Sequence, residues 1–519
     1  MFRTLRNLGR LIGIARTLAR HDALFPFAEL GAPASALSLA RRLWGPGRAP
    51  PERRPGQRLA AALQALGPSF IKLGQALSTR PDLVGPELAD DLSELRDRLP
   101  PFPGAEARAE VSRQLGKPLD ELFASFDEEA VAAASIAQVH FAVTAAGEEV
   151  AVKVLRPGIE AAFRRDLELL EWLAEGVERT RPDLRRLRPV DAVRTFAETV
   201  DLEMDLRFEA AAASELRDNR GDDESFRVPV VDWQRTSRRV LTLERIAGIP
   251  IDHREALKAA GHDLEAIVAK LVGAFLTQAF GDGFFHADLH PGNLFIDEAG
   301  NIGAVDFGIM GRLDRKTRRY VAELLLAFLT ADYRRAAEVH FEAGYVPPSK
   351  SVDAFAQACR SIAEPILGRP VKEVSMGRLL AQLFEVTRTF EMTTQPQLLL
   401  LQKTMMVAEG VGRSLAPEVN MWELARPILE HCMRESLGPE ARLRDAAEDT
   451  AALARRFPAL IEKAEQATRL LADGGLKLHP DTARQIAAEQ ARRRRPLYLL
   501  LWVTVLLLGL LLVLALNRV

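Results

Sequence analysis

A segment near the middle of the chain, HADLHPGNLFIDEAGNIGAVDFG at residues 286–308, constrains the fold more than any other. Asp288 precedes Asn293 by five positions, and Asp306 opens an Asp-Phe-Gly thirteen positions further on. The apolar runs LFID and IGAV flank a turn at Glu298–Gly300, which predicts a short hairpin. The hairpin would bring two carboxylates and an amide together at one end. Oxygen ligands of this kind suit Mg²⁺ that is bound beside phosphate. The segment therefore predicts a phosphoryl-transfer site.

A lysine inside an apolar strand is the second constraint. The stretch VAVKVLRPG surrounds Lys153 with valines in a pattern typical of a strand. A buried ammonium requires anionic partners, and the V-A-I-K pattern of kinases supplies nucleotide phosphates and a helix glutamate. Because Lys153 lies upstream of the Asp/Asn/Asp-Phe-Gly segment, in the order of a kinase, we expect it to pair with ATP.

Upstream of Lys153, the place of a Gly-rich phosphate loop holds AVAAASIAQVH, residues 130–140. Alanine restricts φ where glycine does not. We therefore expect a stiffer loop that approaches phosphates differently from a kinase loop. A strand of small residues packed under a helix would have the same sequence pattern.

Periodicity divides the chain into a small mixed sheet followed by a larger helical part, which predicts two lobes. Helical periodicity ends near Leu99, where three prolines follow within four positions. The expected elements are a linker at Gly45–Gly56, strands within Val131–Val154, a helical region over Ile159–Ala213, strands in VPVVDW and RVLTLERI, and helices over Arg254–Ala491.

Composition excludes several classes of protein. With 519 residues, 27% of them charged, the chain is long enough for two or three domains with a sizeable core. A net charge of −2 gives no sign of nucleic-acid binding. Cys359 and Cys432 are too few for a disulfide framework, and no Cys/His group has zinc spacing.

The C-terminus predicts a membrane anchor. Leu497–Leu516 is a run of twenty residues without a charge, long enough as a helix to cross a hydrocarbon core of roughly 30 Å. A buried core helix fits less well, because the run is apolar on every face. Arg492–Arg495 precede it, so the positive-inside rule predicts that the rest of the chain faces the cytoplasm.

The N-terminus is basic and has no uninterrupted apolar core of the signal-peptide type. Its arginines alternate with apolar residues, which predicts either an amphipathic helix on a membrane surface or a solvated helix. They are Arg3, Arg6, Arg10, Arg16 and Arg20.

Together with KLGQ at Lys72–Gln75 and EMDLRFEA at Glu203–Ala210, these motifs resemble the UbiB/ADCK family of atypical, protein-kinase-like ATPases, which is linked to ubiquinone biosynthesis. The resemblance covers residues 59–344. It implies an α+β, bilobal protein-kinase-like fold, with a small sheet-containing N-lobe and a large helical C-lobe. The expected ranges are 1–57 for the basic segment and linker, 58–120 for a helical KxGQ extension, 121–245 for the N-lobe with a helical insert, 246–490 for the C-lobe and 497–516 for the transmembrane helix.

The resemblance also implies roles for single residues. Asp288 is implied as the catalytic residue, Asn293 and Asp306 as Mg²⁺ ligands, and Lys153 as the ATP-pairing lysine. Glu209 is implied as the helix glutamate that pairs with Lys153, although Glu168 competes by sequence alone. The implied nucleotide loop comprises Val131, Ala132, Ala133, Ala134, Ser135, Ile136, Ala137, Gln138 and Val139, and the implied regulatory residues are Lys72, Gln75, Glu203 and Asp205.

The implied function is that of a kinase or ATPase anchored in the cell inner membrane, which uses Mg²⁺ and ATP to support ubiquinone biosynthesis. Membrane lipids or quinone intermediates, and the enzymes of the pathway, are the implied partners. One departure is that Ala287, not arginine, precedes Asp288; another is that no Ala-Pro-Glu follows the Asp-Phe-Gly. Both weaken the case for a peptide substrate. Bacterial members often end in two spans, whereas this chain has room for one.

Two other classes remain open on the sequence. A small-molecule kinase of the aminoglycoside or choline type also uses a His-x-Asp…Asn loop, but it does not explain the KLGQ helix, the Ala-rich loop or the apolar tail. A catalytically inert scaffold would not need the intact set of Lys153, Asp288, Asn293 and Asp306.

Lys72 and Gln75 interrupt an apolar helical pattern three positions apart, so they share a helix face. An ordinary surface helix has the same pattern. The family resemblance instead implies that this helix crosses the mouth of the nucleotide site, with Lys72 facing the carboxylates of Glu203 and Asp205. We therefore predict an autoinhibitory or substrate-restricting lid.

Overall fold

The computed structural model describes most of the chain up to Leu437. The described residues are 2–29, 33–45, 54–78, 84–93, 95, 99–181, 185, 188–221, 223–364, 386, 389–392 and 395–437. The chain separates into two units, Met1–Ser436 and Leu437–Val519. The elements described below belong to the first unit, apart from the last residue of its final helix.

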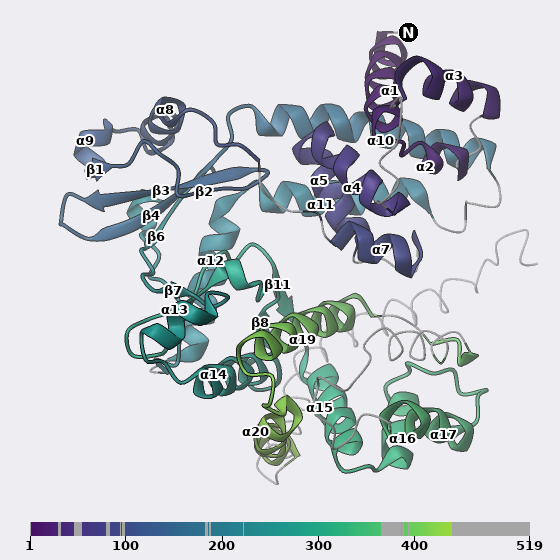
Figure 1. Ribbon diagram of the computed structural model, residues 1–519, viewed down its shortest axis with the longest axis vertical. Helices are drawn as coiled ribbons and strands as arrows, with labels where there is room; N and C mark the ends of the chain where they lie inside the picture. Colours follow the sequence, from purple (N-terminus) through teal and green to yellow (C-terminus); the bar gives the residue numbers. More distant parts are fainter. Residues whose placement is uncertain are drawn as a thin grey trace, which may run out of the picture. The chain divides into compact units, whose positions relative to one another are not determined.

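A group of helices begins the chain (Figure 1). Ile14 and Leu18, from the apolar side of the first helix, pack in a core with Leu59, Leu63 and Leu169. The expectation that this apolar side lies on a membrane surface is therefore wrong for Ile14 and Leu18, because the protein interior already covers them. The helices are α1 (Phe2–Arg20), α2 (Phe25–Glu29), α3 (Ala34–Trp44), α4 (Pro55–Leu66), α5 (Pro68–Ser78) and α7 (Pro86–Ser93).

An antiparallel sheet follows, in which β1, β3, β4 and β6 are neighbours in that order and β2 pairs with β3. Val152 and Val154 point to one face of β4, where they pack with Val111 of α8 and Leu122 of α9. Lys153 lies between them, so strand alternation turns it to the other face. The elements are α8 (Gly104–Leu115), α9 (Leu119–Leu122), β1 (Phe123–Phe126), β2 (Ala132–Ala133), β3 (Ala137–Thr144), β4 (Glu149–Leu155) and β6 (Val240–Glu244).

The helical region expected over Ile159–Ala213 consists of separate helices. One break follows Glu203, where Asp205 ends the gap by accepting a hydrogen bond from the Arg207 N–H as an N-cap. Pro189 begins the middle helix, a position where its missing N–H costs nothing. The helices are α10 (Ile159–Thr180), α11 (Pro189–Glu203) and α12 (Leu206–Arg220).

The strand expected in VPVVDW is wrong. Only Val231 forms a bridge, to Leu243 of β6, and the nearest strand is β5 (Phe226–Arg227). The alternation is lost because Pro229 has no N–H to donate to a ladder. Asp232 then caps the short helix η2 (Trp233–Arg235) by accepting from two backbone N–H groups.

The larger part of the fold is helical but contains two small sheets. One has the order β5-β10-β9-β7, and β9 and β10 form the antiparallel hairpin expected from LFID and IGAV. The other pairs β8 with β11. The elements are β7 (Ile249–Pro250), α13 (Arg254–Ala259), α14 (Leu264–Leu276), the π-helical η3 (Thr277–Asp282), β8 (Phe284–His286), the 3₁₀ turn η4 (Pro291–Asn293), β9 (Leu294–Ile296), β10 (Ile302–Ala304), β11 (Met310–Arg312), α15 (Arg315–Leu329), α16 (Tyr333–Glu342), α17 (Val352–Ala363), α19 (Pro396–Leu415) and α20 (Met421–Leu437).

The continuous helical stretch Leu264–Asp282 is, among the described residues, the one long and apolar enough to cross a membrane. Most of it is buried inside the protein, and Val268 and Leu271 are completely enclosed. It therefore has the character of a core helix. The predicted anchor at 497–516 lies outside the described residues, so the structure leaves that prediction as it stands.

Close packing explains the glycine of KLGQ. A Cβ added to Gly74 on α5 would lie 2.3 Å from Leu95 Cδ1 and 2.9 Å from Leu63 Cδ1. We expect Gly74→Ala to lower the free energy of unfolding by about 1–3 kcal/mol, because these side chains must move. Gly176→Ala on α10 is the matched control, since nothing lies within 4 Å of its added Cβ. Thermal unfolding should separate the two variants, and equal midpoints would contradict the packing argument.

Candidate functional site

An ion pair joins the sheet to α12. Lys153 Nζ donates to both carboxylate oxygens of Glu209, at 2.8 and 2.9 Å. Glu209 lies in the first turn of α12 and its side chain is buried. The structure thus forms the pair implied by the family resemblance, whereas the competing Glu168 lies on α10 and does not contact Lys153.

A second carboxylate shares the same ammonium. Lys153 Nζ lies 2.9 Å from Asp306 Oδ1, so a single lysine bridges Glu209 and Asp306. The Asp306 side chain keeps 47% of its surface exposed, which leaves it accessible to a ligand. Its backbone has φ 63, in the left-handed region, which is a strained conformation for a non-glycine residue.

Burial and charge set the protonation of this triad. The Lys153 ammonium holds the pKa of Asp306 far below its usual range. Burial raises the pKa of Glu209 to about 7, against the attraction of Lys153. Burial also opposes the charge on Lys153, but the carboxylates of Asp306 and Glu209 outweigh it and raise the Lys153 pKa. Asp306 therefore stays anionic whenever Lys153 is charged.

The loop after β8 positions Asp288 and Asn293. Asn293 Nδ2 donates to the Asp288 backbone carbonyl at 3.1 Å and to Asp288 Oδ2 at 3.0 Å. Its own backbone N–H donates to the His290 carbonyl, which closes the 3₁₀ turn. Because the amide nitrogen faces Asp288, the amide oxygen is the atom of Asn293 suited to bind a cation.

His286 ties this loop to the Asp-Phe-Gly segment. Its Nδ1 accepts the Asp288 N–H at 3.1 Å, so the proton sits on Nε2, which donates to the Val305 carbonyl at 3.2 Å. The ring is fully buried beside Phe307, and burial lowers the His286 pKa. A neutral imidazole thus spans the two segments that carry the acidic side chains.

The Ala-rich loop is a hairpin held from both sides. Ala132 and Ala133 pair with β3, and the Ala134 N–H donates to the Ala137 carbonyl at 2.8 Å. The guanidinium of Arg156 donates to the Ala134 carbonyl at 2.8 Å. Gln138 is buried, and its side chain accepts from the Phe102 N–H and donates to the Phe102 carbonyl.

The remaining loop candidates occupy different environments. Val131 is exposed, Ser135 and Ile136 are buried, and Val139 lies opposite Lys153 in the sheet. Sequence reasoning missed Arg156, although it follows Lys153 by three positions in VKVLRPG.

Lys72 approaches the same site from α5. Its Nζ lies 2.8 Å from Glu203 Oε2, with both side chains largely buried, and its charge helps to lower the pKa of Asp306. Asp205 differs from the expectation of an acidic pair facing Lys72: it caps α12 and forms a bidentate pair with Arg207, at 2.9 and 2.7 Å. Gln75 lies one turn further along α5 and is half-buried.

A buried threonine holds the residue that precedes Asp288. Thr404 on α19 shares its hydroxyl hydrogen between its own Leu400 carbonyl, at 2.8 Å, and the Ala287 carbonyl, at 3.1 Å. Ala287 is the residue before Asp288, where a kinase has arginine. No motif around Thr404 identifies it, because the contact joins residues 117 positions apart.

Comparisons with known proteins agree with this geometry. Residues 94–340 match the ABC1 atypical kinase-like domain, and residues 359–420 match the UbiB helical domain. The fold and the site therefore define an atypical kinase-like protein. A protein named "Probable protein kinase UbiB" from Marinobacter nauticus is 42% identical over 91% of this chain and 86% of its own length. The chain belongs to the UbiB family, whose name links it to ubiquinone biosynthesis.

Other relatives carry the same name. The protein from Aeromonas salmonicida is 44% identical, over 79% of this chain and 76% of its own length. The one from Xanthomonas oryzae pv. oryzae is 45% identical, over 80% of this chain and 75% of its own length. A solved structure titled as the complex of Rv3197 with erythromycin, from Mycobacterium tuberculosis, is 27% identical over 68% of this chain and 90% of its own, with a TM-score of 0.47.

The contact from Thr404 can be tested without measuring activity. Thr404→Val keeps the shape of the side chain but removes the hydroxyl donor, which costs about 1–3 kcal/mol when a buried carbonyl loses its partner. We expect the amides of Asp288 and Asn293 to exchange hydrogen faster in this variant. Thr404→Ser retains the donor and is the control. Equal exchange in both variants would show that the contact does not support the loop.

Proposed function

We propose that this UbiB-family chain binds Mg²⁺ and ATP at Lys153, Asp288, Asn293 and Asp306, and acts as a membrane-anchored atypical kinase or ATPase in ubiquinone biosynthesis. The observation that carries the proposal is the Lys153 ammonium held between Glu209 and Asp306. A lysine fixed by a helix glutamate is positioned to meet nucleotide phosphates. The exposed Asp306 beside it supplies a carboxylate for a cation.

The donor set fits Mg²⁺ bound together with phosphate. In the part of the chain that the structure describes, no group of three or more His, Cys, Asp or Glu side chains converges to hold a metal by itself. Asn293 and Asp306 would supply side-chain oxygens, and phosphate and water would complete the shell, as Mg²⁺ prefers. Bound there, the ion would offset phosphate charge. Asp288, hydrogen-bonded by Asn293, would orient the acceptor hydroxyl or water.

Features around the site support an acceptor smaller than a folded protein. Ala287 lacks the arginine that would pair with a phosphorylated activation loop. After the Asp-Phe-Gly, the chain forms β11 and then enters α15 at Arg315, without an Ala-Pro-Glu segment. This arrangement favours ATP hydrolysis or transfer to a small molecule over peptide phosphorylation.

The apolar run at 497–516 supports placement in the cell inner membrane, with the kinase-like part in the cytoplasm. The intermediates of an isoprenoid-quinone pathway are lipids, so an anchor would keep the ATP site close to them. We propose that the protein uses ATP to handle such lipid or quinone intermediates or to regulate the enzymes that act on them.

The assignment of Asp306 can be tested directly. We expect Asp306→Asn to abolish hydrolysis of ATP with Mg²⁺, since a metal ligand should cost more than the about 10- to 100-fold typical of a supporting residue. Glu298→Gln, an exposed residue in the same hairpin turn, is the control and should retain activity. Steady-state ATPase assays compare the two, and unchanged hydrolysis in Asp306→Asn would refute the metal assignment.

The lid is proposed from the ion pair between Lys72 and Glu203. Lys72→Ala should release α5 from the end of α11, so ATP turnover and autophosphorylation should rise. Lys117→Ala, an exposed lysine before α9, removes the same charge away from the site and should have no effect. If both variants match the parent chain in both assays, α5 is not a lid.

The pathway is tested in cells. A deletion strain should contain less isoprenoid quinone by lipid extraction and chromatography, and the wild-type chain should restore it. Asp288→Asn should not restore it, because the proposed role needs turnover. Full restoration by Asp288→Asn would favour an inert scaffold, and normal quinone in the deletion strain would reject the pathway.

A further inference from the structure

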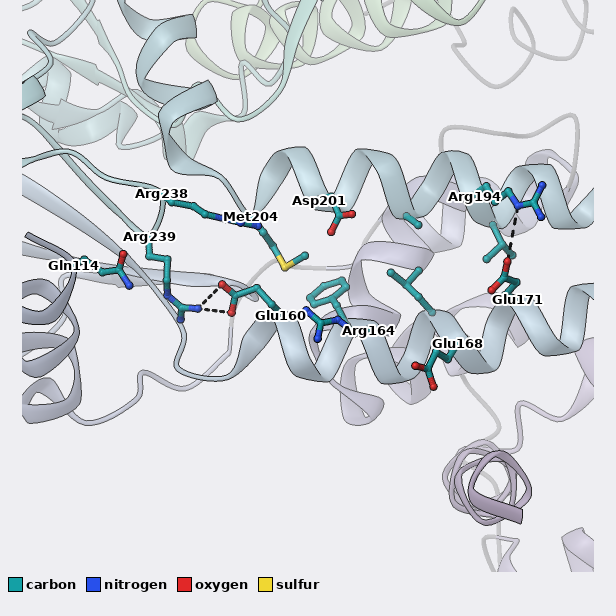
Figure 2. Close-up of a pocket in the computed structure, with 14 residues that line it drawn as sticks. Gln114, Glu160, Arg164, Glu168, Glu171, Arg194, Asp201, Met204, Arg238 and Arg239 are labelled. Atoms are coloured by element: carbon teal, nitrogen blue, oxygen red, sulfur yellow. Dashed lines mark hydrogen bonds and ion pairs between the residues drawn. The ribbon is translucent and has the colours of Figure 1, made fainter. Parts of the chain in front are cut away.

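A groove of about 760 Å³ lies between α10 and α11, and none of the nucleotide-site residues lines it (Figure 2). On α10 its lining runs from Glu160 to Glu171, and on α11 from Val193 to Met204. The lining positions recur at helical spacing, so each helix presents one side to the groove. Eleven steps of 1.5 Å, from Glu160 to Glu171, make the groove about 16 Å long.

The floor of the groove is apolar and its ends are closed by ion pairs. Phe163, Leu167, Ala197 and Met204 contribute apolar side chains. At one end Glu160 pairs with Arg239, whose Nε also lies 2.6 Å from Glu110. At the other end Arg194 lies 3.8 Å from Glu171. The protein itself therefore neutralises the charges at both ends.

Of the four arginines that line the groove, Arg164 and Arg238 are not part of the ion pairs at its ends. Within the described part of the chain, neither side chain forms a hydrogen bond or an ion pair, and both line the groove. Figure 2 shows both of them in the half of the groove that holds Met204.

Most of the acidic side chains near Arg164 and Arg238 already have other partners. Asp201 and Glu168 both line the groove, but Glu168 has an interaction of its own and points away from α11 in Figure 2. Asp205 lies near Arg238 but is already paired with Arg207. The available charge in this half is therefore positive.

We propose that the groove is a binding site for an anionic amphiphile with a single linear chain, separate from the nucleotide site. The chain would lie along Leu167, Val193 and Ala197, which line the groove and are only partly buried, so that burial of each methylene is favourable. The anionic group would sit between Arg164 and Arg238 and meet guanidinium donors. This site goes beyond the proposed function and does not depend on it.

One end of the groove lies at the joint between α11 and α12, that is, at Met204 and Asp205. A bound molecule would therefore affect the position of residues at the nucleotide site. Met204 is the C-cap of α11 and follows the Glu203 that pairs with Lys72. The Arg238 carbonyl accepts the Leu206 N–H at 2.9 Å, which holds the start of α12. The same helix carries Glu209, the partner of Lys153, so binding should couple to ATP affinity.

Photolabelling tests the site in the full-length chain, held in nanodiscs of zwitterionic lipid. A diazirine-bearing tetradecyl phosphate should label peptides of α10 and α11, and unlabelled alkyl phosphates should compete. We expect competition to strengthen about fourfold per methylene and to level off once the chain fills the groove. Inorganic phosphate should compete weakly because it lacks the alkyl chain, and tetradecanol should compete weakly because it lacks the anionic group.

Variants separate the groove from general partition into lipid. Arg238→Gln should weaken labelling about 10- to 100-fold through the loss of a charged donor, and Ala197→Trp should block the floor. Arg165→Gln, an exposed neighbour outside the lining, is the matched control. Labelling that survives both Arg238→Gln and Ala197→Trp, or competition that strengthens without levelling off, would overturn the proposal.

The coupling is measured separately from the site. ATP affinity should change by about fivefold or more when tetradecyl phosphate is present, and ATP should change the affinity for tetradecyl phosphate by the same factor. Lys72→Ala should reduce this coupling while labelling persists. Labelling without any shift in ATP affinity would refute the coupling through the joint. Labelling in a chain that binds no ATP would refute the proposed function but leave the amphiphile site standing.

Discussion

The Lys153 ammonium, held between Glu209 and Asp306, is the interaction on which the rest of the site depends. It joins a strand of the sheet, the first turn of α12 and the Asp-Phe-Gly segment through contacts of 2.8 to 2.9 Å. Removing one partner of a buried pair costs about 3–5 kcal/mol, because the other charge is left without compensation. The triad therefore fixes the position of the sheet relative to α12 and to the Asp-Phe-Gly segment.

The joint between α11 and α12 connects this triad to features that an ordinary kinase lacks. Glu203 ends α11 and holds Lys72 of the KLGQ helix, while Asp205 caps α12 and so sets the direction in which Glu209 points. Both the proposed lid and the proposed amphiphile groove act at this joint. A small shift there would change the partners of Lys72 and Lys153 together.

Local patterns predicted a large part of the fold. The hairpin of β9 and β10 was predicted from two apolar runs around a turn. The position of Lys153 within a strand was predicted from the apolar pattern around it. Where sequence reasoning was wrong, the deciding features are ones that hydrophobic periodicity does not register. The segment around Val231 alternates like a strand, but Pro229 and the cap at Asp232 divert it. On α1, Ile14 and Leu18 looked suited to a membrane surface, but they pack in a core with residues as distant in sequence as Leu169.

The sequence by itself determined which residues stand in a kinase-like order and spacing, namely Lys153, Asp288, Asn293 and Asp306. Tertiary structure decided which distant groups meet them. Glu209 pairs with Lys153 across 56 positions, and Thr404 reaches Ala287, next to Asp288, across 117. Such contacts depend on how helices pack and where caps break them. Those details are absent from local periodicity, because hydrophobic pattern specifies a buried face but not its partner.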